Sequence, residues 1–258
     1  MNGLLLGLLL PLAGTTLGAG CVFLMRRTLS ARLEKTMLGF AGGIMTAASV
    51  WSLLIPSMEM TGSDGLYRVV PAVAGFVVGV LFLLLLDVTI PHQHVESDKA
   101  EGLPSRLSRT SRLTMAVTIH NIPEGMAVGV ALAAVLEHSV YIPLSAALAL
   151  SAGIAIQNFP EGAIVSMPMR AMGNSRMRAF IVGTLSGVVE PIAAILTILL
   201  ATLITPILPY LLAFAAGAMI YVVVEELVPA TQTGPHSNLG TLGFAAGFAL
   251  MMFLDTVI

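Results

Sequence analysis

The sequence has little charge. Of its 258 residues, only 10% are Asp, Glu, Lys or Arg, whereas a soluble domain usually carries about 25%. So few charges cannot cover a surface exposed to water. A formal net charge of −2 gives no indication of a nucleic-acid partner, and we expect none. The single cysteine, Cys21, excludes an internal disulfide framework and a metal site built from thiolates.

Long apolar runs dominate the chain instead. Hydrophobic residues make up 57% of it, and the mean hydropathy is +0.94. A helix needs about 20 apolar residues to cross a hydrocarbon core about 30 Å thick. Eight segments meet this requirement: 3–25, 36–56, 70–90, 112–136, 142–168, 178–204, 208–228 and 238–257. The sequence therefore predicts an all-α polytopic membrane protein, with one domain of eight transmembrane helices over residues 1–258.

Basic residues are distributed unevenly between the predicted loops. Arg68 is the one basic residue in an even-numbered loop. The odd-numbered loops and their edges hold Arg26, Arg27, Arg32, Lys35, Lys99, Arg106, Arg109, Arg112, Arg170, Arg176 and Arg178. Because cytoplasmic loops carry the excess of Lys and Arg, we expect the odd-numbered loops in the cytoplasm and both termini outside it. The short loops favour a multi-pass protein of a prokaryotic cell (inner) membrane.

Two similar hexapeptides place polar side chains near the middle of predicted helices. Residues 120–125 read HNIPEG, and residues 157–162 read QNFPEG; Glu190 adds a carboxylate to the sixth span. A charged residue at the bilayer centre costs about 2.5 kcal/mol or more. Every Lys and Arg lies in a loop or at the end of a span. The carboxyl groups must therefore be protonated, hydrated in a cavity, or bound to a visiting cation.

The spacing within the hexapeptides predicts a single site. Positions i and i+4 share a helix face, so His120 lies beside Glu124, and Gln157 lies beside Glu161. The proline in each hexapeptide removes a backbone donor, and irregular backbone at membrane depth is tolerated where it lines a cavity. The two motifs resemble an inverted pair about an axis in the membrane plane, which is where transporters place their substrate.

Ligand chemistry narrows the choice of ion. One imidazole with several carboxylates and amides suits Zn²⁺, Fe²⁺, Mn²⁺ or Cd²⁺, and no thiolate is present to favour Cu(I). Glu124 and Glu161 are placed to bridge two ions with Glu190 closing one side, although the spacing does not require two. As an alternative, the His, Asn and Gln side chains form interhelical hydrogen bonds of about 0.6–2 kcal/mol each in a purely structural protein.

The two hexapeptides resemble the paired fourth- and fifth-helix signatures of the ZIP (zinc/iron-permease-like) family. Residues 47–56 and 91–94 are similar to its GufA-like subgroup. The resemblance covers essentially the whole chain. It implies an eight-helix bundle with inverted-repeat character, often a homodimer in the lipid bilayer, that admits divalent metal into the cytoplasm.

The resemblance also implies a binuclear site between the fourth, fifth and sixth helices. One ion would be held by His120, Glu124, Gln157 and Glu161. The second would be held by Asn121, Glu124, Asn158, Glu161 and Glu190. Some relatives have His in place of Gln157 and Asp in place of Asn158, so this chain offers one imidazole and one anion fewer.

Further metal-ligating residues lie at two span ends on the predicted cytoplasmic side. Asp87, His92 and His94 end the third span, and Glu225 and Glu226 end the seventh. They are candidates for an exit path that receives the ion as it leaves the central site. The alternative is an ordinary solvated helix end, since loops routinely carry such residues.

Our hypothesis for the mechanism is alternating access, in which the helices bearing the site slide or rock against a scaffold. A selective metal channel with the same ligands remains an alternative. A membrane metalloenzyme fits less well, because the H-E-x-x-H order is missing. Asn121 stands where its catalytic Glu would be, and Glu124 stands where its second His would be.

Overall fold

The computed structural model describes residues 2–24, 29–61, 65–93, 101–203 and 207–257. Over these residues the chain is helical, and one isolated bridge between His92 and Glu101 is the extent of its β pairing. Eight helices in the described part are long and apolar enough to cross a membrane. The predicted all-α bundle is confirmed.

The eight spans are built from the following elements. They are α1 (Asn2–Ala19) with α2 (Cys21–Leu24); α3 (Ala31–Ala48) with the π-helix η1 (Ser49–Leu54) and α4 (Ile55–Glu59); α5 (Leu66–Thr89); α6 (Arg109–Leu136); α7 (Leu144–Ala171); α8 (Arg176–Gly187) with α9 (Val189–Leu203); α10 (Leu208–Val222) with the π-helix η3 (Val223–Leu227) and α11 (Val228–Thr231); and α12 (Leu239–Val257).

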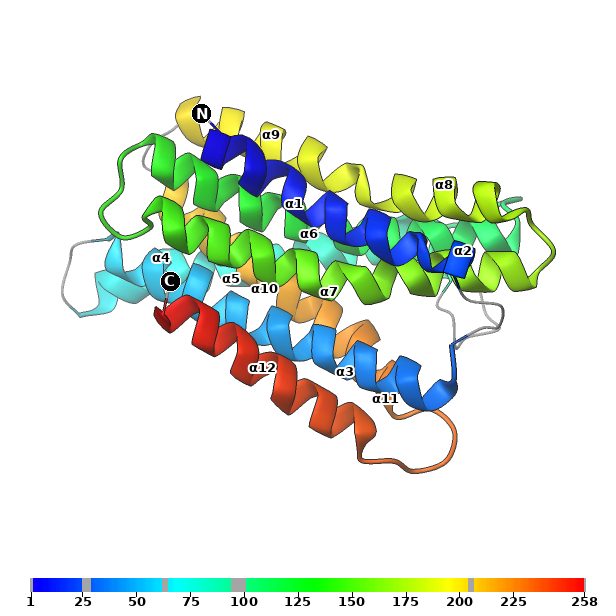
Figure 1. The fold of residues 1–258 in the computed structure, drawn as a ribbon. Coiled ribbons are helices and arrows are strands. Elements are labelled where there is room, and N and C mark those ends of the chain that lie inside the picture. The colour runs from blue at the N-terminus through cyan, green and yellow to red at the C-terminus, as the bar shows by residue number, and fades with distance from the viewer. Residues whose placement is uncertain (1, 25–28, 62–64, 94–100, 204–206, 258) are drawn as a thin grey trace.

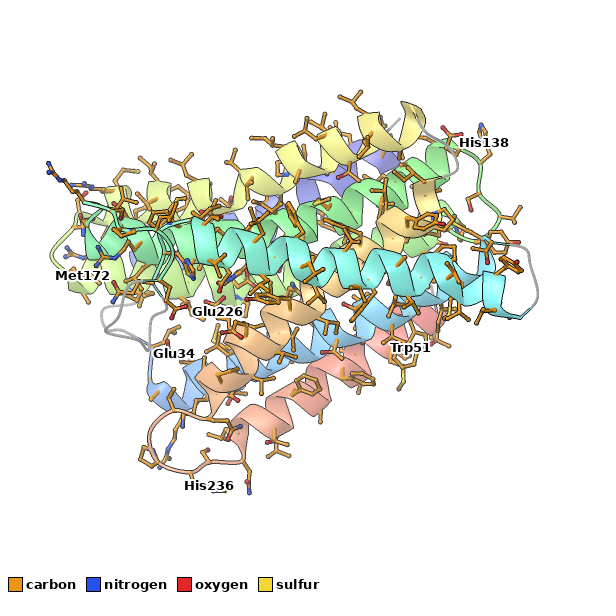
Figure 2. The ribbon with its side chains drawn as sticks, turned by 180° about the vertical axis from the view of Figure 1, so that it is seen from behind. Glu34, Trp51, His138, Met172, Glu226 and His236 are labelled. Carbon is orange, nitrogen blue, oxygen red and sulfur yellow. The ribbon has the colours of Figure 1, made fainter. Side chains whose placement is uncertain are left out.

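The spans form two groups, drawn one above the other in Figure 1. The first group comprises α1, α6, α7, α8 and α9, and the second comprises α3, α5, α10, α11 and α12. The start of α1 and the end of α12 lie at the same end of the bundle, as an even number of spans requires. His138 lies at this termini end, whereas Met172 and His236 lie at the opposite end, which we call the odd-loop end (Figure 2).

Glycines mark the tightest helix pairs, which are α1 with α7, α6 with α9, α3 with α12, and α5 with α10. A Cβ on Gly14 would collide with the carbonyl oxygen of Ala155, and one on Gly125 would collide with that of Glu190. Small residues let helix backbones approach in this way when lipid supplies no hydrophobic driving force. These glycines therefore lie where the backbones of paired helices approach each other most closely.

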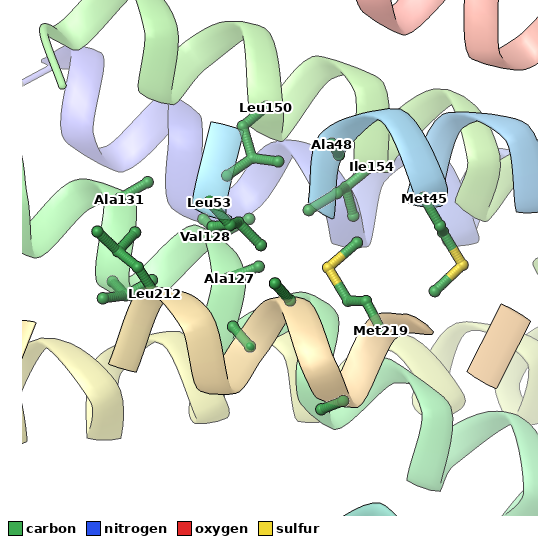
Figure 3. Packing of buried hydrophobic residues seen from close by; sticks show 14 of the residues in the cluster. Met45, Ala48, Leu53, Ala127, Val128, Ala131, Leu150, Ile154, Leu212 and Met219 are labelled. Carbon is green, nitrogen blue, oxygen red and sulfur yellow. The ribbon is translucent and has the colours of Figure 1, made fainter. Parts of the chain in front are cut away.

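A buried apolar cluster occupies the boundary between the two groups. Leu53, Val128, Leu150, Ile154 and Leu212 belong to it, and they come from η1, α6, α7 and α10 (Figure 3). In α6 and α7 these apolar residues lie closer to the termini end than the hexapeptide of the same helix does, and Leu53 and Leu212 lie toward that end of their own spans. We call these five residues the apolar plug, because they fill the bundle on that side of the polar residues.

Three departures from a regular α-helix occur beside polar residues. The π-helices η1 and η3 lie within the second and seventh spans, and each is followed two residues later by a proline, Pro56 or Pro229. The sixth span breaks at Val188, one residue before α9 begins. Helices α6 and α7, by contrast, continue through the prolines of their hexapeptides. Insertions of the π type are frequent at functional sites.

Candidate metal centre

The structure brings together all seven side chains that the sequence predicts as central ligands. Helix α6 supplies three, α7 supplies three, and the first turn of α9 supplies one. They are His120, Asn121, Glu124, Gln157, Asn158, Glu161 and Glu190, and all are buried, the most exposed being Glu161 at 8%. The closeness of α9 to α6 at Gly125 places Glu190 beside the HNIPEG segment.

Hydrogen bonds connect these side chains across the three helices. Gln157 Nε2 donates to Glu124 Oε1 at 2.7 Å. Asn121 Nδ2 donates to Glu190 Oε1 at 3.0 Å and to the carbonyl oxygen of Ser186 at 3.1 Å. The nitrogen of each of these two amides therefore donates to a neighbouring carboxyl group, and the amide oxygen remains available as a ligand.

Several buried polar atoms remain without a hydrogen-bond partner. They are Asn121 Oδ1, Glu124 Oε2, Gln157 Oε1, Glu190 Oε2 and both amide atoms of Asn158. A buried acceptor without a partner costs about 1–3 kcal/mol, so native proteins rarely leave one. Here such oxygens gather at one place on three helices. A set of convergent oxygens with an adjacent imidazole fits a divalent cation as the bound substrate.

The carboxyl groups of the site lie close enough for mutual repulsion. Glu124 is near Glu161 and Glu190, and Glu190 is near Glu161. The imidazole of His120 contacts Glu226, which lies beside these carboxyl groups. Like charges in a medium of low polarity repel strongly, and a divalent ion between them would convert that repulsion into attraction.

A seventh-span carboxylate reaches the site from the other helix group. Glu226, in η3, contacts His120 Nδ1 through its Oε2 atom and lies near Glu161. Figure 2 shows this residue between the two groups. The π-helix adds a residue to the turn and so changes the direction in which the following side chains point. The sequence places Glu226 at a helix end; the structure places it at the central ligands.

A cavity of about 270 Å³ connects the site with the odd-loop end. His120 and Glu161 line it near the ligands, Glu225 and Glu226 line it from the seventh span, and the rest of its polar lining comes from Glu34, Gln93, Glu101 and Thr233. Glu225 and Glu226 both face this cavity, and Glu225 is also exposed to solvent, so their place on an exit path stays a prediction. On the opposite side of the ligands lies the apolar plug.

The predicted exit residues of the third span form a cluster of their own. Asp87, His92 and Glu101 each offer one ligand atom, and these atoms lie within 4.8 Å of one another. Tyr221 donates its hydroxyl proton to Asp87 Oδ2 at 3.2 Å. His92 is fully buried, so it is not part of a solvated helix end. His94 lies outside the described residues.

The contacts of His92 distinguish its two ring nitrogens. Its Nδ1 atom lies 2.9 Å from the carbonyl oxygen of Ile90, so in the neutral ring the proton is on Nδ1. The lone pair on Nε2 then faces Asp87 Oδ1 at 3.1 Å. Two acceptors at this distance require a proton or a metal ion between them. Next to His92, the buried Gln93 accepts hydrogen bonds from Arg112 at 3.0 and 3.1 Å, which fixes this segment against α6.

Sequence reasoning missed several polar residues that the structure places at the site or along the cavity, among them Thr15, Glu34, Glu101, Ser186 and Tyr221. Glu34 and Glu101 stand in polar segments, where no local pattern separates them from ordinary surface acids. Ser186 contributes through its backbone carbonyl, which every residue has. Thr15 and Tyr221 had one signal, which is a polar atom within an apolar span.

Comparison with known proteins decides the family. A family model described as "ZIP Zinc transporter" matches residues 89–255. The chain belongs to the ZIP family. This confirms the resemblance drawn from the paired hexapeptides, and it excludes the metalloenzyme alternative, because ZIP proteins are transporters.

Relatives of this ZIP chain cover nearly its whole length. It is 35% identical to "Zinc transporter ZIP11" of Homo sapiens, over 97% of this chain and 96% of that protein. It is 38% identical to "Zinc transporter ZIPB" of Bordetella bronchiseptica, over 95% of this chain and 78% of that protein. Identity to "Zinc transporter GufA" of Myxococcus xanthus is 36%, over 95% of both chains. The last match agrees with the predicted GufA-like character.

Proposed function

We propose that this protein carries Zn²⁺ into the cytoplasm through the centre formed by α6, α7 and α9. The observation that carries the proposal is the set of buried oxygens without hydrogen-bond partners beside His120. The relatives named as zinc transporters support Zn²⁺ as the cargo. Cd²⁺, Fe²⁺ and Mn²⁺ accept the same ligand types, so we expect them to compete.

The hydrogen bonds of the site support two adjacent ion positions. His120 and Glu161 line the cavity, and the first ion would bind there with Gln157 and Glu124. Asn121, Asn158 and Glu190 would hold the second ion, again with Glu124 and Glu161 as bridges. The second position has two neutral amides among its ligands, so we expect it to bind the ion more weakly than the first.

The contrast between the two sides of the site supports alternating access. Toward the odd-loop end the ligands border a cavity, and toward the termini end they meet the apolar plug. The ligands belong to one helix group, while Glu226, Leu53 and Leu212 belong to the other. Sliding of the first group against the second would close the cavity and open a path past the plug. This conformation would then be the one that releases metal.

The direction of release follows from the distribution of charge. The basic residues of the odd-numbered loops favour a cytoplasmic position for the odd-loop end, and hence extracytoplasmic termini in a cell (inner) membrane. An ion leaving through the cavity would enter the cytoplasm. We also expect a homodimer, an expectation that rests on the family alone.

The residues along the cavity support a stepwise exit. An ion leaving His120 and Glu161 would first meet Glu226 and Glu225, and then the Asp87, His92 and Glu101 cluster nearer the loops. Several sites of moderate affinity release an ion faster than one tight site, because each step crosses a smaller barrier.

Replacement of Glu226 by Gln tests this exit path. The variant keeps the size of the side chain and removes the charge that contacts His120. We expect the maximal Zn²⁺ flux to fall about tenfold while KM changes little, because release and not capture is impaired. Glu137→Gln, an exposed residue at the termini end, serves as the matched control. An unchanged maximal flux in Glu226→Gln would remove this residue from the path.

The proposal as a whole is tested by metal flux into proteoliposomes that contain a trapped zinc-sensitive dye. We expect flux that saturates with Zn²⁺ concentration, is reduced by added Cd²⁺, and stays far below the rates of free diffusion. A carrier saturates because each cycle requires a conformational change, whereas a channel conducts at much higher rates. No flux of any of the four divalent ions from folded protein would refute the proposal. Fast, unsaturated flux would favour the channel.

A further inference from the structure

Thr15 is a buried hydroxyl in an otherwise apolar part of the first span. Its side chain is completely buried, and its Oγ1 atom lies 3.1 Å from Oε1 of Glu190. The neighbouring Thr16 is only partly buried. None of the seven predicted ligands is on the first span, so this contact joins the first span to the metal centre as well.

The backbone of α1 is held against the site by close packing on both sides of Thr15. A Cβ on Gly162 of α7 would collide with the carbonyl oxygen of Thr15, and one on Gly187 would lie 2.8 Å from its Oγ1 atom. Gly14 and Gly18 of α1 contact the backbone of α7 in the same manner. Thr15 therefore has little freedom to move relative to α7, α8 and the first turn of α9.

Two acceptors compete for the single hydroxyl proton of Thr15. One is the carbonyl oxygen of Pro11 at 3.4 Å, the usual partner four residues earlier in a helix, and the other is the nearer carboxyl oxygen of Glu190 at 3.1 Å. A hydrogen bond to an ionised acceptor is about twice as strong as one to a neutral acceptor. The shorter distance favours Glu190 as the acceptor, and the charge adds to this preference when Glu190 is ionised with a cation bound.

The two carboxyl oxygens of Glu190 differ in their hydrogen bonds. Oε1 accepts from Thr15 Oγ1 and from Asn121 Nδ2, whereas Oε2 has no hydrogen-bond partner. Two donors on one oxygen, coming from α1 and α6, fix the rotation of the carboxyl group about its terminal bond. The other oxygen is left free for a cation. Outer hydrogen bonds of this kind orient metal ligands, and their loss typically costs about 10–100-fold in metal affinity.

We propose that Thr15 is a positioning residue of the metal centre, which holds the Glu190 carboxylate with one oxygen directed to the cation. The inference rests on the proposed function and extends it to α1. It predicts that the hydroxyl, and not the methyl group, of Thr15 sets the affinity of the site. If Thr15 had only a packing role, its methyl group would matter and its hydroxyl would not, because the methyl group fills the space between α1 and α8.

The test compares four proteins in Zn²⁺ flux assays: the wild type, Thr15→Val, Thr15→Ser and Thr16→Val. Valine has the shape of threonine without the hydroxyl, and serine keeps the hydroxyl without the methyl. We expect Thr15→Val to raise KM about tenfold with maximal flux within about twofold of wild type. We expect Thr15→Ser to restore KM to within about threefold, and Thr16→Val, the same change on a different face of α1, to leave it unchanged.

Several results would overturn the inference. A KM for Thr15→Val equal to that of Thr16→Val would show that the hydroxyl does not act on the site, and a Thr15→Ser variant as impaired as Thr15→Val would show that the methyl group matters. If Thr15→Val does not fold, Thr15→Ala takes its place in the same comparison. If the Val change raises KM as much in a Glu190→Gln background as in wild type, Thr15 does not act through Glu190.

The outcome for this inference is separable from the outcome for the proposed function. If wild type shows no saturable flux, the proposed function fails before any variant is compared. If wild type transports Zn²⁺ and Thr15→Val transports it with the same KM, the proposed function stands and Thr15 has no positioning role.

Discussion

Replacement of Glu161 by Gln is expected to reduce the transport efficiency for Zn²⁺, measured as maximal flux over KM, by more than about 100-fold. Glu161 is 8% exposed, lines the cavity, and lies near the carboxyl groups of Glu124, Glu190 and Glu226. Like His120, it borders both the buried oxygens and the cavity that leads to the exit. Loss of a direct ligand should exceed the 10–100-fold loss typical of an outer hydrogen bond.

The measurement is dye-detected flux into proteoliposomes, with the amount of folded protein matched between variants. Glu161→Gln keeps the volume and the hydrogen-bonding capacity, so folding should survive and only the anionic ligand is lost. Glu161→Asp, which keeps the charge on a shorter side chain, should be intermediate. Glu137→Gln repeats the chemical change at an exposed position of the termini end and should transport as wild type does. Full activity of Glu161→Gln would show that the transported ion does not bind at this centre.

Replacement of Gly14 by Ala is expected to cause a large loss of stability for a single added methyl group. The new Cβ would collide with the carbonyl oxygen of Ala155, an atom of the α7 backbone that no side-chain rotation can move. Helix α1 would have to shift away from α7. Overpacking of this kind costs about 1–3 kcal/mol and occasionally more. Because Thr15 is the next residue, the shift should also impair transport.

Gly42→Ala provides the matched control, since it makes the same change in another buried helical glycine. There the nearest atom to the new Cβ is a ring carbon of Phe244 at 3.5 Å, which is an ordinary van der Waals contact. Alanine is also the better helix former by about 1 kcal/mol. Thermal unfolding in detergent micelles should therefore show a clear drop in Tm for Gly14→Ala and little change for Gly42→Ala. Equal Tm values would contradict the close α1–α7 packing.

The spans were predictable because each is defined locally. About 20 apolar residues in a row can lie only in a membrane or a core, and a helix is the way to satisfy their backbone groups there. The hexapeptides could also be identified from the sequence, because a carboxylate within an apolar span is energetically costly and needs a compensating interaction. The i, i+4 spacing then placed His120 beside Glu124 without any tertiary information.

The contacts of the exit residues could not be predicted from local sequence patterns. Glu226 reads as one of two acids at a helix end, and the π-helix that brings it to His120 has no reliable pattern in the sequence. Glu101 joins Asp87 and His92 because the chain folds back after the third span, and this return depends on contacts such as that of Gln93 with Arg112. These contacts join residues that are far apart in the sequence or that follow no regular helical spacing, so no local pattern predicts them.

The sequence by itself determined the class of protein, its eight spans and, through the paired hexapeptides, the family, and it predicted the seven side chains that the structure brings together. Each of these depends on the composition of a continuous segment or on a spacing within one helix. Tertiary structure alone decided that the cavity opens toward the odd-loop end, that Glu226 meets His120, and that Thr15 binds Glu190. These contacts join residues from separate helices, and their formation depends on how closely the backbones pack at particular glycines, which a single sequence does not specify.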